Sequence, residues 1–361
     1  MEVETVLVTG ANRGIGLEFV RQLVQLSKPP LYLCLLLTEM RLRYRQTALA
    51  DDGAVAPMQK KKCVHNSNFQ CHRGLLDYPS DYRIREVRFE TRQENQKLPS
   101  TPSFSQQPRG GPRPPWGCCE NEEEEYISSF GTYQALKEIK DASKETEIHL
   151  IKLDVSKTDE IENARKTVAE VVGDRGLNLL INNAGAARWL GFPDITEEDM
   201  VFHFKTNTVG PVIVFKEMLP LLQISAKHKS TGVDVSKTIV LNISSTAGSI
   251  AVLTDTNPLW REYLSVMGYR ISKTALNMAM RVAALSVKDE GILVVNMCPG
   301  WVKTDMGTDR AMIEVSESVS DMMKMLPQLN VTHQGAFLDR HGNTILIKEE
   351  YLLIPFMISL Q

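Results

Sequence analysis

Several features of exported, membrane-embedded and nucleic-acid-binding proteins are scarce in this sequence of 361 residues. No apolar run has the length of a membrane span, and the N-terminal residues lack a signal-peptide pattern. The net charge is only −3, which gives no basic surface for nucleic acid. We therefore expect a cytoplasmic protein with neither a membrane nor a nucleic acid as its partner. The apolar content of 43% is enough for a substantial core.

Cysteine is also sparse, and its six positions do not form a disulfide framework, which favours a reducing compartment. These positions are Cys34, Cys63, Cys71, Cys118, Cys119 and Cys298. A zinc site built from Cys63, His65, Cys71 and His72 is an alternative, but the spacing fits no regular zinc finger. We expect no metal.

The most informative stretch lies at the N-terminus. Residues 5–8 are typical of a buried strand, and residues 15–26 carry apolar side chains at helical spacing. Between them, Gly10, Gly14 and Gly16 predict a tight turn whose backbone N–H groups can approach a phosphate at a helix N-terminus. The spacing differs from the best-known dinucleotide fingerprint, so an ordinary strand-to-helix turn is the alternative interpretation.

The rest of the chain alternates strands and helices, apart from one long stretch. We expect strands at 31–38, 148–155, 177–181, 238–243 and 292–297, and helices at 156–172, from 196 through Asn207, and at 268–288. This order predicts an α/β fold with a doubly wound parallel sheet, in which ligands bind beyond the carboxyl ends of the strands. Asp154, Asn182, Ser245 and Pro299 would then lie along that edge.

Residues 39–129 show no sustained periodicity. They are rich in proline and glycine near 99–117 and carry an acidic run at 122–125, a composition that predicts a disordered insertion. The expected organisation is a single domain in two parts, 1–38 and 130–347, interrupted at 39–129 and followed by an atypical tail at 348–361.

Tyr269 and Lys273 lie four positions apart and share one helix face. A neighbouring ammonium would lower the pKa of a tyrosine from about 10, and the pair can then exchange a proton with a carbonyl or alcohol oxygen. Ser245 can hold the same oxygen by a hydrogen bond. Tyr133 and Lys137 have the same spacing, but no strand-end serine precedes them, so we interpret them as part of a solvated helix face.

Taken together, these motifs resemble the short-chain dehydrogenase/reductase superfamily, and within it the sniffer/C-factor-like carbonyl reductases. The resemblance rests on residues 9–16, 154–155, 182–185, 207, 245, 269, 273, 298–306 and 335–339, and it covers about 3–30 and 130–347. It implies a Rossmann-like fold and a nicotinamide cofactor, which would supply the redox chemistry while the protein supplies orientation.

The resemblance also implies a role for each matching residue. Tyr269 would protonate the substrate oxygen beside Ser245, Asn207 would hold a water in a proton relay through Lys273, and Asp154 would contact adenine. The full set of implied catalytic residues is Asn207, Ser245, Tyr269 and Lys273. The implied cofactor-binding residues are Gly10, Asn12, Arg13, Gly14, Ile15, Gly16, Asp154, Val155, Asn183, Ala184, Gly185, Tyr269, Lys273, Pro299, Gly300, Val302 and Thr304.

We therefore predict NADPH-dependent reduction of an aldehyde, ketone or quinone. NADP(H) is expected over NAD(H) because the Arg13 guanidinium lies inside the glycine turn, where it can pair with a ribose phosphate. Glu39 is the competing signal, since an acidic residue after the second strand favours NAD. A catalytically silent nucleotide-binding or interaction protein, disabled by the insertion, is the alternative. The sequence names no substrate, and it leaves the oligomeric state open, with a homodimer as one option.

Overall fold

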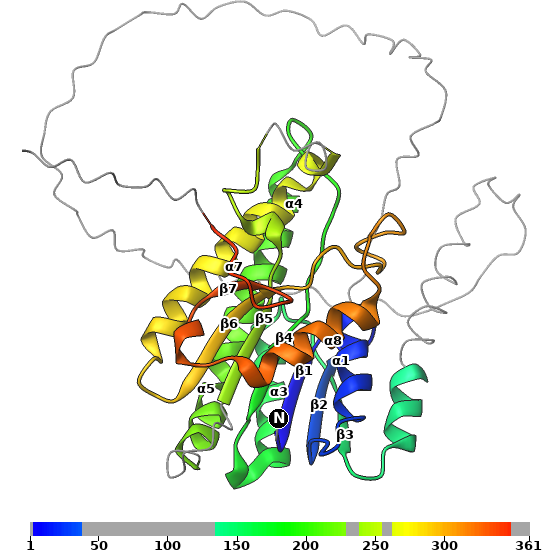
Figure 1. The fold of residues 1–361 in the computed structure, drawn as a ribbon, viewed down its shortest axis with the longest axis vertical. Coiled ribbons are helices and arrows are strands. Elements are labelled where there is room, and N and C mark those ends of the chain that lie inside the picture. The colour runs from blue at the N-terminus through cyan, green and yellow to red at the C-terminus, as the bar shows by residue number, and fades with distance from the viewer. Residues whose placement is uncertain (1–2, 38–133, 229–237, 255–261, 348–361) are drawn as a thin grey trace, which may run out of the picture. The chain divides into compact units, whose positions relative to one another are not determined.

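The computed structural model describes residues 3–37, 134–228, 238–254 and 262–347. Within these ranges, seven parallel strands form one sheet in the order β3-β2-β1-β4-β5-β6-β7 (Figure 1). The strand order changes direction between β1 and β4, the point at which doubly wound sheets bind ligands. The expected Rossmann-like fold class is confirmed.

The strands each pair in parallel with their neighbours in the sheet. Their bounds are β1 Thr5–Thr9, β2 Tyr32–Leu37, β3 Glu147–Lys152, β4 Leu179–Asn182, β5 Thr238–Ile243, β6 Ile292–Cys298 and β7 Phe337–Asp339. The α-helices are α1 Gly14–Leu23, α3 Thr158–Val172, α4 Glu197–Phe204, α5 Gly210–His228, α7 Met267–Ser286 and α8 Val315–Met325, and residues 134–142 are also helical. Short turns of 3-10 helix are found at Gly173–Arg175, Thr246–Gly248, Glu262–Val266, Leu326–Gln328 and Val331–His333.

The core has two layers, because successive strand residues point to opposite faces of the sheet. On one face, Val6 and Val8 pack with apolar residues of α1 and α8. On the other face, Leu7 packs with residues of α3, α5 and α7. The two layers bury both faces of the sheet, as its continuously apolar strands predict.

Three differences from the expected elements have local causes. The strand expected at 148–155 ends at Lys152, so Asp154 lies in the following loop. The helix expected to begin near Ser156 begins at Thr158, and the Ser156 hydroxyl donates to Asp154 Oδ1 at 2.7 Å. The long helix through Asn207 is interrupted by a π-helical turn at Lys205–Val209. The expected insertion at 39–129 and the tail at 348–361 lie outside the described residues.

The joined α4–α5 segment, Glu197–His228, is long and apolar enough to cross a membrane by length and composition alone. This corrects the expectation that no segment reaches that length. Half of its most apolar window is buried inside the protein, and residues of its α5 part pack in the core layer that includes β4 and β5. The segment is therefore accounted for as a core helix of the fold.

Candidate functional site

The glycine turn after β1 brings backbone close to backbone. Gly10 has φ +63°, and a Cβ built there would lie 2.9 Å from the Cα of Ala184. A Cβ on Gly16 would lie 2.2 Å from the carbonyl oxygen of Gly10. Only glycine fits these two positions without displacing the backbone, so the sequence spacing follows from steric constraint. Asn12 lies in the same turn, and Ile15 lies in the first turn of α1.

The first turn of α1 has no side-chain cap. Its N-cap residue is Arg13, whose side chain makes no capping hydrogen bond. The N–H groups at such a helix end need an acceptor, and the helix dipole favours an anionic one. The glycine turn and this helix end therefore fit the pyrophosphate of a dinucleotide.

Asn183 connects the loop after β4 to the glycine turn. Its amide nitrogen Nδ2 donates to the carbonyl oxygens of Thr9 and Gly10, each at 3.0 Å, and Thr9 Oγ1 accepts from the backbone N–H groups of Asn183 and Ala184 at 2.9 Å. The Asn183 side chain, which was expected to bind the cofactor, thus fixes the two loops to each other.

Asn207 lies in the π-helical turn and is fully buried. Its Oδ1 accepts from Ala186 N at 2.8 Å, while its Nδ2 donates to Ala186 O at 2.8 Å and to Ser272 Oγ at 3.0 Å. A Cβ built on Gly185 would lie 3.3 Å from Asn207 Oδ1 and 3.7 Å from Lys273 Nζ. Because Gly185 has no side chain, the space between Asn207 and Lys273 stays open.

Tyr269, Lys273 and Ser245 meet where β5 and α7 come together. Ser245 hydrogen-bonds to the Tyr269 side chain. Lys273 Nζ lies 5.7 Å from the centroid of the Tyr269 ring and donates to Ile243 O at 2.8 Å. The structure thus brings together the three residues that the sequence predicted to share one substrate oxygen, next to Asn207.

The expected lowering of the Tyr269 pKa is wrong for this structure. Burial raises the pKa of Tyr269 to about 12, although the hydrogen bond with Ser245 acts in the opposite direction. Burial also lowers the pKa of Lys273 to about 8. The Lys273 ammonium donates to the Ile243 carbonyl oxygen, and desolvation is the largest effect on the pKa of Tyr269. The tyrosine therefore keeps its proton at neutral pH, as a proton donor must.

The loop after β6 is held from two sides. Cys298 Sγ accepts from the backbone N–H groups of Thr246 at 3.2 Å and Gly300 at 3.4 Å. Pro299 O accepts from Ser318 Oγ of α8 at 2.7 Å. These contacts fix Pro299 and Gly300 between the loop that carries Ser245 and helix α8.

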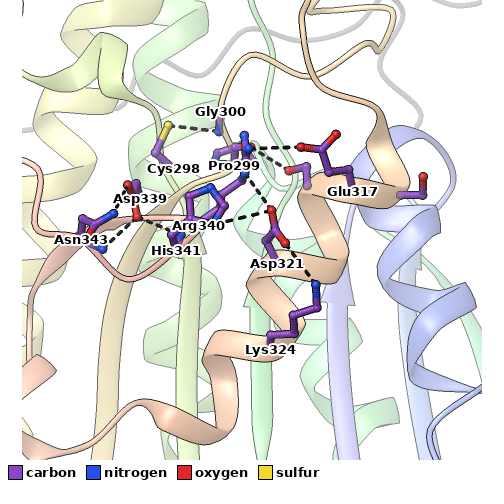
Figure 2. A network of polar contacts seen from close by, with 12 residues as sticks. Cys298, Pro299, Gly300, Glu317, Asp321, Lys324, Asp339, Arg340, His341 and Asn343 are labelled. Atoms are coloured by element: carbon purple, nitrogen blue, oxygen red, sulfur yellow. Dashed lines mark hydrogen bonds and ion pairs between the residues drawn. The ribbon is translucent and has the colours of Figure 1, made fainter.

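Figure 2 shows how α8 is joined to the chain after β7. The Arg340 guanidinium lies beside Gly300 and pairs with Asp321 at 3.0 Å and Glu317 at 3.2 Å, both on α8. Asp339 accepts from the backbone N–H groups of His341 and Asn343 and closes the turn that carries Arg340.

The loop after β6 then returns to the glycine turn. A Cβ on Gly14 would lie 3.3 Å from Thr304 Cγ2, and Val302 in the same loop is buried. Arg13, expected to bind a phosphate, pairs here with Asp305 at 3.0 Å. The two loops thus face each other across the carboxyl ends of the strands, where a ligand would lie.

Asp154 and Val155 follow β3 on the same edge of the sheet. The Asp154 carboxylate accepts from the backbone N–H and hydroxyl of Ser156, and Val155 packs against Gly210. In this structure both residues make local contacts that shape the loop, and their expected contacts with the cofactor stay predictions.

A polar cluster that was not predicted from the sequence lies next to this site. Arg188 Nη1 pairs with Asp199 Oδ1 at 2.8 Å, and the Arg188 backbone N–H donates to His203 Nε2 at 2.8 Å. Asp199, His203 and Asn207 follow one another at intervals of four residues, and this periodicity is the signal that could have revealed the cluster.

Among the described residues, no group of three histidine, cysteine, aspartate or glutamate side chains could hold a metal ion. The alternative zinc ligands Cys63, His65, Cys71 and His72 lie outside the described residues.

Comparisons with known proteins agree with this geometry. The family model for short chain dehydrogenase matches residues 127–313, just over half of the chain. The "C-signal" of Myxococcus xanthus is 35% identical over 170 residues, which cover 47% of this chain and 92% of that protein. An uncharacterized oxidoreductase of Schizosaccharomyces pombe, C663.06c, is 29% identical over 231 residues, which cover 59% of this chain and 83% of that protein.

Solved structures give the same result. An NADPH-bound carbonyl reductase from chicken fatty liver has 29% identity and a TM-score of 0.63, with 96% of this chain and all of that chain covered. The carbonyl reductase Sniffer of Drosophila melanogaster has a TM-score of 0.63 over the same shares, and at 23% identity it supports the fold alone. The family model and the C-signal match agree with the arrangement of the loops described above. The chain therefore belongs to the short-chain dehydrogenase family of oxidoreductases.

Proposed function

We propose that the protein is an NADPH-dependent carbonyl reductase that converts an aldehyde, ketone or quinone to an alcohol. The observation that carries this proposal is the meeting of Tyr269, Ser245 and Lys273 next to the glycine turn that fits a dinucleotide. The similarity to a carbonyl reductase solved with NADPH supports the choice of reaction and of cofactor.

Each residue has a chemical task in this reaction. When bound, the nicotinamide ring supplies a hydride to the carbonyl carbon. Tyr269 gives its phenolic proton to the carbonyl oxygen, because burial keeps that proton in place at neutral pH. Ser245 donates a hydrogen bond to the same oxygen and holds it near the tyrosine.

Lys273 and Asn207 prepare the site for the next turnover. Lys273 has a pKa of about 8 and can pass a proton toward Tyr269 after each reaction. Asn207 fixes Ala186 and Ser272 and so holds the wall of the site beside Gly185. A water bound near Asn207 would complete the path from Lys273 to solvent.

The test is the substitution Tyr269→Phe in the full chain. We expect turnover of a quinone or an aldehyde to fall by about 10² to 10⁴-fold, the usual contribution of a general acid. NADPH binding, followed by its fluorescence, should change less than about twofold, since the hydroxyl acts on the substrate oxygen.

Tyr133→Phe is the matched control, since Tyr133 has the same spacing to a lysine but no serine at a strand end before it. Turnover at the native rate in Tyr269→Phe would refute the proposal. NADPH binding by the native chain without turnover of any carbonyl would favour a catalytically silent protein.

A further inference from the structure

His203 is a buried histidine that the proposed reaction does not use. It lies on α4 with no exposed surface, one helical turn before Asn207. Its Nε2 accepts the backbone N–H of Arg188 at 2.8 Å, and its Nδ1 lies 2.7 Å from Asp199 O. Since a backbone N–H can only donate, Nε2 must be unprotonated, and the hydrogen is on Nδ1.

The imidazole joins two segments of the site. On one side of the ring is the loop at 186–190, which leads away from the candidate cofactor site. Arg188 binds this loop to His203 and Asp199 of α4. Ala186 binds it to Asn207 of the π-helical turn. On the other side, a Cβ built on Gly268 would lie 2.6 Å from His203 Nδ1. Gly268 directly precedes Tyr269, so the ring packs against the backbone that places the tyrosine.

The same loop also contacts the start of α7 directly. Met267 N donates to Leu190 O at 3.1 Å, and a Cβ on Gly191 would lie 2.7 Å from Leu264 O. The loop, His203 and the first turn of α7 thus form one packed unit. A change in the hydrogen bond between Arg188 and His203 is therefore expected to change the position of Tyr269.

We propose that His203 is a positioning residue for Tyr269, active only as the neutral imidazole, and that its protonation in mild acid loosens the loop at 186–190 and lowers turnover. This inference deepens the function proposed above and depends on it for its activity measurement.

The physical reason lies in what faces the ring. A proton on Nε2 would point at the N–H of Arg188, so that two donors would meet and that hydrogen bond would be lost. The charged groups that act on His203 are Arg188 in the loop and Asp199 on its own helix, and the facing residue on α7 is the uncharged Gly268. Burial and Arg188 lower the pKa of His203, whereas Asp199 raises it, with a net shift below the usual 6.5.

The test compares two substitutions over pH 5 to 8 in the full chain. His203→Gln keeps an acceptor for the Arg188 N–H but cannot be protonated in this range, whereas His203→Ala removes the acceptor. We expect native kcat to fall at least threefold in acid, with its midpoint below the histidine reference value of about 6.5. His203→Gln should keep at least a third of native turnover at pH 7.5 and should not show this fall in kcat at low pH, the acid limb of the profile.

His203→Ala should lower kcat about tenfold at pH 7.5, with a smaller difference from the native chain in acid, while leaving the Kd for NADPH within about threefold, because a misplaced proton donor affects the chemical step. His149→Gln, which alters a histidine on β3, the edge strand farthest in the sheet order from β7, should keep the native profile. An unchanged acid limb in His203→Gln would overturn the proposal.

A second measurement does not depend on activity. Hydrogen exchange of a peptide covering 186–190, corrected for the intrinsic rate, should be faster at pH 5.5 than at pH 7.5 in the native chain and unchanged in His203→Gln. Equal exchange at both pH values in the native chain would overturn the role of His203. If no carbonyl is turned over at any pH, the proposed function fails while the exchange data still decide this inference.

Discussion

At the scale of single residues, the site contains polar groups that reduce the stability of the fold. Lys273 is 4% exposed, and burial lowers its pKa from 10.5 to about 8. A shift of this size corresponds to a stability cost on the order of 3 kcal/mol. This cost is present in full below pH 8 and fades as the pH rises toward 10.5, where the unfolded chain also loses the proton.

We therefore predict that Lys273→Met abolishes turnover and stabilises the fold. The free energy of unfolding at pH 7 should rise by about 1–2 kcal/mol, less than the full cost, because Ile243 O loses the hydrogen bond donated by Lys273. Urea-induced unfolding at pH 7 and at pH 10 measures both values. The difference from the native chain should shrink at pH 10, and an equal difference at both pH values would contradict the prediction.

At the scale of elements, the glycine turn before α1 and the loop after β6 are joined by the Arg13–Asp305 ion pair. The two side chains are 40% and 76% exposed, so the pair contributes at most about 1 kcal/mol, and a phosphate can displace Asp305. When a phosphate takes the place of Asp305 beside Arg13, the negative charge of Asp305 would repel the phosphate that Arg13 attracts.

We predict that Arg13→Ala raises the Kd for NADPH by about tenfold and leaves the Kd for NADH nearly unchanged, since only NADPH carries the extra phosphate. Asp305→Asn should lower the Kd for NADPH about twofold at low salt. The control is Asp309→Asn, an exposed acid in the same loop. Fluorescence titration of both cofactors checks these values, and equal effects on NADPH and NADH would exclude Arg13 as the phosphate ligand.

At the scale of the whole molecule, the sheet is complete within the described residues. β2 pairs in register with β1 and with β3 over its length, and its side chains contribute to both core layers. The cost of closing a loop grows slowly with its length, by about 0.6 kcal/mol for each doubling. We propose that residues 45–125 contribute nothing to catalysis.

The corresponding prediction concerns a chain in which a short turn replaces residues 45–125. It should unfold within a few degrees of the full chain and bind NADPH more tightly, because β2, which precedes the segment in sequence, ends on the edge of the sheet where the adenosine is expected. Thermal unfolding, protease resistance and NADPH titration of the two chains provide the comparison. Unfolding of the shortened chain would show instead that the segment is part of the fold.

Much of this protein was determined by the sequence alone. The apolar runs of the strands and the alternation with helices predicted a parallel sheet, because burial on both faces requires continuous apolar strands. The positions of Gly10 and Gly16 follow from a turn in which a Cβ would collide with backbone. The Tyr269–Lys273 spacing and Ser245 at a strand end predicted the cluster that the structure brings together, since strand ends of a parallel sheet share one edge.

Only the tertiary structure decided what depends on contacts between distant segments. The pKa of Tyr269 moves up because burial outweighs the hydrogen bond with Ser245, and burial cannot be read from a local spacing. The ion pair between Arg13 and Asp305 joins residues 292 positions apart. In the sequence, His203 is not distinguishable from other polar residues on a helix. The fold places Arg188 and Gly268 on either side of its ring, and the hydrogen bond from Arg188 gives this buried histidine a single tautomer.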